Sequence, residues 1–263
     1  MKISKLSLWL TPVIALLVII ASSAGLFIKS IYARETLSWT VQAYGQDIAN
    51  LVATAALLVA LYFVSKGSIR AFLVWVGILL SLLYPYVIYA FDVHFNSLFL
   101  VYVALVGLCF YTLVSSMLHL RLDEASFAVN SKARVVSGFL MLVAVLFYLL
   151  WLSGDIPALL TGKIPQTVLE NGLLTNPVHV LDIGLYLPAM IITSILLWRR
   201  KLLGYLLALP MLVFSIFTGI GILATFLVMS SQGMAVSLGV ELFIAAIVLV
   251  SLVLSVLYVK EVK

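Results

Sequence analysis

Long apolar runs alternate with short polar segments along the whole chain. Each run can cross the ~30 Å hydrocarbon core of a bilayer as a helix, and none alternates with the period of two that barrel strands require. We therefore predict an all-α integral membrane protein, one domain over residues 1–263, with about eight transmembrane helices. The predicted spans are 6–28, 46–64, 71–91, 98–118, 135–152, 178–198, 202–229 and 236–258.

The basic residues between these runs predict an orientation, because cytoplasmic loops carry an excess of Lys and Arg. With both termini inside, the outer segments contain only Lys29, Arg34 and Lys163. The remaining basic residues then fall on the cytoplasmic side: Lys2, Lys5, Lys66, Arg70, Arg121, Lys132, Arg134, Arg199, Arg200, Lys201, Lys260 and Lys263. We expect a multi-pass protein of the plasma (cytoplasmic) membrane, with its N- and C-termini inside.

The overall composition agrees with this prediction, since 65% of the residues are hydrophobic and only 10% are charged. Soluble domains contain roughly 25% charged residues. The net charge of +5 does not indicate nucleic-acid binding, because the basic residues lie in short clusters between apolar runs. We expect the lipid bilayer to be the main partner.

One long segment on the predicted outer side, residues 153–177, contains regularly spaced apolar residues. Such a pattern favours a segment that lies in the membrane interface. We predict that it covers the outer mouth of the bundle.

Polar residues inside membrane helices are costly and therefore informative. In the topology above, the strongly polar residues of four spans all lie in the outer half of the membrane or at its outer surface. Within each span their spacing of three, four, six or seven residues places them on one helix face. The four sets are Asp47, Asn50 and Thr54; Tyr86, Tyr89 and Asp92; His179, Asp182 and Tyr186; and Ser237 with Glu241.

These polar faces predict a shared pocket that opens to the outside and binds a small ligand or a cation, as in a sensor or a transporter. Glu241 supports the prediction most strongly, because it lies more than one turn into the predicted span 236–258 and needs a partner there. The expected pocket residues are Asp47, Asn50, Tyr89, Asp92, His179, Asp182, Tyr186 and Glu241.

Two alternatives remain open at this point. In the first, His179 and Asp182 bind a divalent metal such as zinc together with Asp92 or His94, and a metal-bound water hydrolyses a lipid or a peptide. In the second, the protein is an accessory subunit whose polar faces contact a membrane-protein partner. The sequence alone does not decide whether the protein is an enzyme.

A weak repeat relates the two halves of the chain. Asp47-Ile48 opens the second predicted span and Lys66 follows it, whereas Asp182-Ile183 opens the sixth and Lys201 follows it. A parallel duplication of a four-helix unit would produce this pattern.

Overall fold

The computed structural model describes residues 5–120, 132–260 and 262, so that Lys2, Arg121 and Lys263 lie outside the described part of the chain. Within that part, eight helical segments are long and apolar enough to cross a membrane, which confirms the predicted helical membrane bundle. The helices are α1 (Lys5–Phe27), α2 (Leu37–Ser65), α3 (Ile69–Asp92), α4 (Phe99–His119), α5 (Lys132–Thr161), α6 (Gln166–Asn171), α7 (Pro177–Leu181), the π-helix η2 (Asp182–Tyr186), α8 (Leu187–Trp198), α9 (Leu202–Ser231) and α10 (Leu238–Val259).

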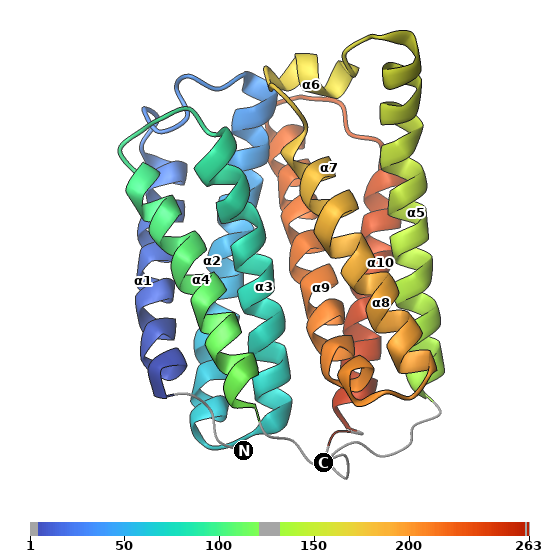
Figure 1. Ribbon diagram of the computed structural model, residues 1–263. Coiled ribbons are helices and arrows are strands. Elements are labelled where there is room, and N and C mark those ends of the chain that lie inside the picture. Colours follow the sequence, from blue (N-terminus) through green and yellow to red (C-terminus); the bar gives the residue numbers. More distant parts are fainter. Residues whose placement is uncertain (1–4, 121–131, 261, 263) are drawn as a thin grey trace.

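The helices form two groups of four with the same order (Figure 1). In the first group, α1, α2, α3 and α4 pack in a ring. In the second group, α5, the continuous crossing α7–η2–α8, α9 and α10 repeat that arrangement. Asp47 of α2 and Asp182 at the start of η2 therefore occupy corresponding helices of the two groups. The groups meet mainly where α9 packs on α2 and α3.

Gly45 permits a close approach between the groups. A Cβ atom at this position would clash with the backbone of Thr225 on α9. Small residues at such contacts let two membrane helices pack backbone against backbone. The extensive contact between α2 and α9 therefore requires a glycine at position 45.

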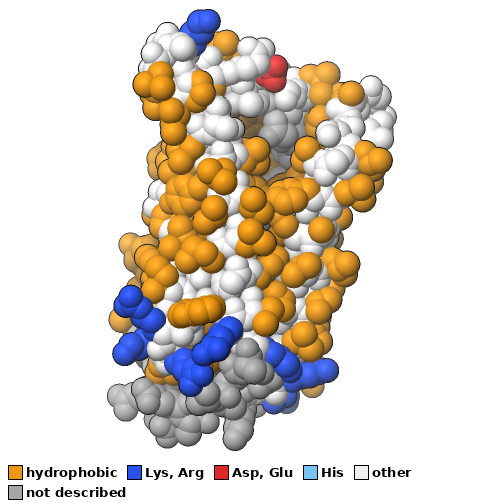
Figure 2. Space-filling model, turned by 90° about the vertical axis from the view of Figure 1, so that its right-hand side faces the viewer, with side chains coloured by type: hydrophobic (Ala, Val, Ile, Leu, Met, Phe, Trp, Pro, Cys, Tyr) orange, Lys and Arg blue, Asp and Glu red, His pale blue; other side chains and the backbone are white. Residues whose placement is uncertain are grey.

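Basic residues gather at one end of the bundle (Figure 2). At this end α2 connects to α3 through Lys66, and α8 connects to α9 through Arg199, Arg200 and Lys201. We call it the basic end. The opposite end carries α6, which lies across the tops of the spanning helices (Figure 1), and we call it the α6 end.

Two helices extend beyond their predicted limits at the α6 end. The structure starts α2 at Leu37 rather than residue 46, because Thr36 caps the helix by accepting a hydrogen bond from the Trp39 backbone N–H at 3.2 Å. It ends α5 at Thr161 rather than residue 152, followed by Gly162 with a φ of 64°. The predicted interfacial segment 153–177 therefore consists of the end of α5, then α6, then the short link to α7.

The sixth crossing contains a π-helical turn at Asp182–Tyr186. The Leu187 N–H donates to the Asp182 carbonyl, five residues back. The next donor in that register would be residue 188, but Pro188 has no N–H, and the Tyr148 hydroxyl of α5 donates to the Ile183 carbonyl instead, at 2.9 Å. Single π turns of this kind are frequent at functional sites.

The replacement Tyr148→Phe is expected to lower the free energy of unfolding by about 1–2 kcal/mol, because the Ile183 carbonyl loses its donor in a partly buried place. Denaturation by SDS, followed by circular dichroism, measures this loss. Faster amide hydrogen exchange should appear around residues 183–187. The replacement Tyr111→Phe is the control, since that ring is exposed on α4. Equal stability of the two variants would contradict the role assigned to Tyr148.

Candidate binding site

A cavity of about 490 Å³ lies inside the second helix group and reaches the boundary with the first. Its walls come from α2, α3, α5, the sixth crossing, α9 and α10, and residues of α6 and the link that follows it complete the lining at the α6 end. Aromatic side chains supply much of the wall: Trp39, Tyr84, Phe147, Trp151, Tyr186, Phe214 and Phe226. The size falls within the range of about 300–1,000 Å³ that is usual for small-molecule pockets.

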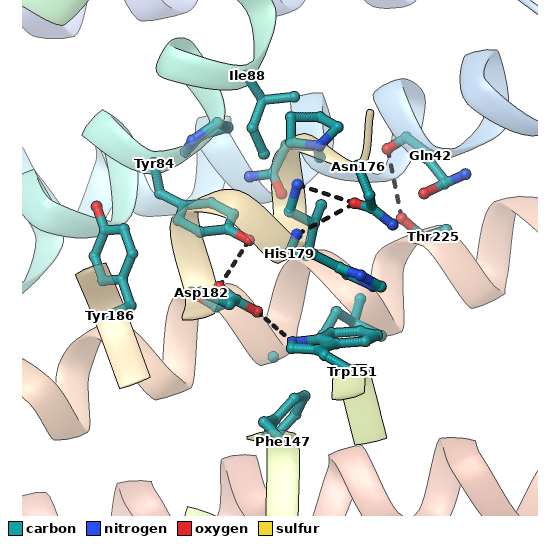
Figure 3. Close-up of a pocket in the computed structure, with 18 of the residues that line it drawn as sticks. Gln42, Tyr84, Ile88, Phe147, Trp151, Asn176, His179, Asp182, Tyr186 and Thr225 are labelled. Carbon is teal, nitrogen blue, oxygen red and sulfur yellow. Dashed lines mark hydrogen bonds between the residues drawn. The ribbon is translucent and has the colours of Figure 1, made fainter. Parts of the chain in front are cut away.

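Asp182 presents a carboxylate to this cavity (Figure 3). The Tyr84 hydroxyl donates to its Oδ1 at 3.0 Å, and the Trp151 Nε1–H donates to its Oδ2 at 2.9 Å. The two donors come from α3 of the first group and α5 of the second. An ionised carboxylate can accept about four hydrogen bonds, so Asp182 retains capacity for a ligand.

His179 lies one turn before Asp182 and also lines the cavity. Its Nδ1 lies 2.9 Å from Oδ2 of Asp155 on α5, and its ring lies 4.5 Å from the Trp151 ring, centroid to centroid. The distance from Nδ1 to the Asp155 carboxylate is that of a hydrogen bond. Asn176 fixes the start of this helix by accepting hydrogen bonds from the backbone N–H groups of Val178 and His179.

Hydrogen bonds at the rim of the cavity connect the first helix group to the second. Gln42, on the part of α2 that extends beyond the predicted span, donates from Nε2 to the Asn171 Oδ1 of α6 at 2.8 Å. The Thr225 hydroxyl of α9 lies 3.5 Å from the Gln42 carbonyl oxygen (Figure 3). The polar side chains of the lining thus concentrate at the α6 end.

The structure brings together part of the predicted pocket. The cavity lining includes Tyr89, His179, Asp182 and Tyr186. The remaining predicted residues lie outside the lining: Asp47, Asn50, Asp92 and Glu241. The cavity therefore includes four of the eight residues predicted to share one pocket, because the polar faces of α2 and α3 are turned partly toward the interior of the first group.

Asp47 is fully buried in the first group. The Tyr32 hydroxyl donates to its Oδ2 at 2.7 Å, and the Tyr89 hydroxyl lies 3.5 Å from its Oδ1. Burial raises the pKa of Tyr32, so this phenol stays protonated and remains a donor. The Tyr89 ring also packs against those of Tyr86 and Tyr102. The space around Asp47 is thus filled by the protein's own aromatic side chains.

The other predicted polar residues have local partners. Asp92 accepts from the Trp39 Nε1–H at 2.8 Å, and Asn50 accepts from the Gln46 Nε2–H at 2.9 Å. Glu241 requires a correction: α10 begins at Leu238, which places Glu241 in the first turn rather than deep in the helix. An acid is favoured there by the helix dipole. Glu241 therefore needs no buried partner.

The predicted metal ligands do not assemble. Among the described residues, no three His, Cys, Asp or Glu side chains are placed so that they could hold a metal ion. His94 lies 3.1 Å from Glu35 at the exposed α6 end, far along the chain from His179 and its partner Asp155. Asp182 and Asp92 accept hydrogen bonds from tryptophan rings instead.

Several residues at the cavity were not predicted from the sequence. Trp39 and Gln42 lie on the extension of α2, and Asp155, which contacts the lining residue His179, lies on the extension of α5. Both extensions lie outside the predicted apolar runs. Tyr84 lies next to Pro85 on α3 and was not among the predicted pocket residues. Searches against protein-family models, curated proteins and solved structures find no match to this chain.

Proposed function

We propose that this protein binds a small, largely apolar molecule in the cavity at the α6 end. The observation that carries the proposal is a cavity of about 490 Å³ with aromatic walls and a few convergent polar groups. Ligand pockets typically combine these two features. The polar end of the molecule would lie near Asp182 and His179, and its apolar part would lie deeper, near Leu187, Met190 and Ile247.

The charge distribution supports an outward-facing site. Lys66, Arg70, Arg199 and Lys201 all lie at the basic end, where the positive-inside rule favours the cytoplasm. The α6 end would then face the outside. The deeper lining is apolar, and this favours a binding or sensing protein over a channel, which needs polar groups along its whole path.

Photolabelling tests the proposal directly. The protein, reconstituted in nanodiscs, is irradiated with an octanol that carries a diazirine group, and the adducts are mapped by mass spectrometry. Adducts are expected on lining residues such as Trp151 and Met190. Thr218 lines the cavity, so Thr218→Trp should fill it and reduce these adducts by at least about tenfold.

The matched control is Thr218→Val, which hardly changes the side-chain volume and should label like the unmodified protein. Adducts on exposed residues such as Leu149 report contact with the bilayer and should be equal in all three proteins. If the adducts on Trp151 and Met190 persist in Thr218→Trp, or occur in none of the proteins, the cavity is not a binding site.

A further inference from the structure

The second helix group is open on one side near the α6 end. Over its whole length, α5 packs closely along α8 and only sparsely along α10. The ring of Phe147 on α5 lies 6.4 Å from that of Phe243 on α10, and the two span the gap. Figure 2 shows a hollow on the face that carries α5, close to the α6 end.

Residues at the edges of this gap line the cavity and are exposed at the same time. Leu150 of α5 is 52% exposed and Val240 of α10 is 48% exposed, and both belong to the lining. The neighbouring outer surface is also apolar, with Leu149 and Leu242 exposed on the same two helices. Such a surface contacts lipid chains, so the gap opens toward the bilayer and offers a sideways route into the cavity.

The polarity of the cavity changes along its length. The side chains near the α6 end include Gln42, Asn176, His179 and Asp182, whereas those nearer the basic end include Val143, Met190 and Ile247. A water molecule takes up ~30 Å³ in the liquid. If each group of the ligand's chain and head needs about that volume, the cavity holds about 16 such groups. A molecule with one chain and one polar head matches this shape and size.

The charges of the lining residues indicate which polar head group the cavity would bind. Among the described residues that line the cavity, Asp182 is the one carboxylate and none is Lys or Arg. His179 is already paired with Asp155. Phosphate and carboxylate heads are normally held by Arg or Lys. An ammonium group would instead meet the Asp182 carboxylate and the faces of nearby aromatic rings, which attract cations.

From these features we propose that the ligand is a single-chain amphiphile with an ammonium head, a long-chain amine, which enters from the bilayer between α5 and α10. The inference rests on the proposed function and names the ligand class and the route for that same cavity. The ammonium head of the amphiphile contacts Asp182, and the chain extends toward Met190 and Ile247.

The head is tested with three diazirine probes that share one chain and differ only in an amine, a hydroxyl or a phosphate head. The amine probe should label Trp151 and Met190 at least about fivefold more than the alcohol, and the phosphate probe least. Asp182→Asn keeps an acceptor for Tyr84 but removes the charge, so it should lower the ratio of amine to alcohol labelling from at least about fivefold to about one. Equal labelling by amine and phosphate probes, or an unaltered amine preference in Asp182→Asn, overturns the proposed head.

The route is tested by closing the gap. In a Cys109→Ala background, which removes the free buried cysteine, Phe147→Cys and Phe243→Cys are bridged with a bifunctional thiol reagent. Bridging before the amine probe is added to the membrane should reduce the labelling of Met190 at least about fivefold. Bridging after loading should not reduce it.

The control bridge joins Ser137→Cys and Ser194→Cys, whose native hydroxyl oxygens lie 3.0 Å apart between α5 and α8, away from the gap. This bridge should not alter labelling. If the cavity is labelled equally with the gap bridged, the sideways route is refuted while the binding site stands. If the unbridged protein shows no cavity labelling with any probe, the proposed function itself fails.

Discussion

Replacing Gly45 with alanine is expected to lower the free energy of unfolding by about 2–3 kcal/mol, at the upper end of the cost of overpacking. The added Cβ would clash with the backbone N and Cα of Thr225, and a backbone cannot turn aside as a flexible side chain can. The strain falls on the contact between the two helix groups, because α2 and α9 form the largest part of it. SDS titration followed by circular dichroism measures the loss.

Gly107→Ala is the matched control, because a Cβ on this α4 glycine meets nothing within 4 Å. Alanine is the better helix former, so this variant should be unchanged or up to ~1 kcal/mol more stable. Equal stability of the Gly45→Ala and Gly107→Ala variants would show that the close approach of α2 and α9 is not required.

Replacing Asp47 with alanine is expected to cost about 2–4 kcal/mol, since it leaves the buried Tyr32 and Tyr89 hydroxyls with one acceptor fewer. Asp47→Asn retains an acceptor oxygen of similar shape and should cost about 1 kcal/mol. The same SDS titration compares the two variants.

A double-mutant cycle separates the hydrogen bond from the cavity left by the side chain. Tyr32→Phe should cost much less in the Asp47→Ala background than in the unmodified protein, because the shared interaction is already lost. Fully additive costs would mean that the Tyr32–Asp47 hydrogen bond does not contribute to stability.

The membrane-spanning helices were predictable because hydropathy reports what a bilayer requires. The limits of α2 and α5 at the α6 end were not, since a helix that leaves the hydrocarbon no longer needs apolar residues. Residues 37–45 contain Ser38, Thr40 and Gln42 and yet continue the helix from the Thr36 cap. Trp39 and Gln42, which line the cavity, lie on that extension.

The sequence placed the polar residues on helix faces but did not give their partners. Spacing places Asp47 and Asp182 each on a helix face, and it does not tell which neighbouring helix that face meets. Asp47 faces tyrosines of its own group, whereas Asp182 is bridged by Tyr84 from the other group. The π turn at Asp182–Tyr186, which depends on Pro188 and on the distant Tyr148, has no local pattern that sequence reasoning could recognise.

Asp47 and Asp182 lie on corresponding helices of the two groups, but their surroundings constrain substitutions differently. Around Asp47 the interior is complete, so a substitution at Tyr86 or Tyr102 is tolerated only when another side chain restores the packing. Around Asp182 part of the interior is empty space, and substitutions at the wall change what fits there at little cost to the fold. Substitutions that change the ligand are therefore expected in the wall of the cavity rather than around Asp47.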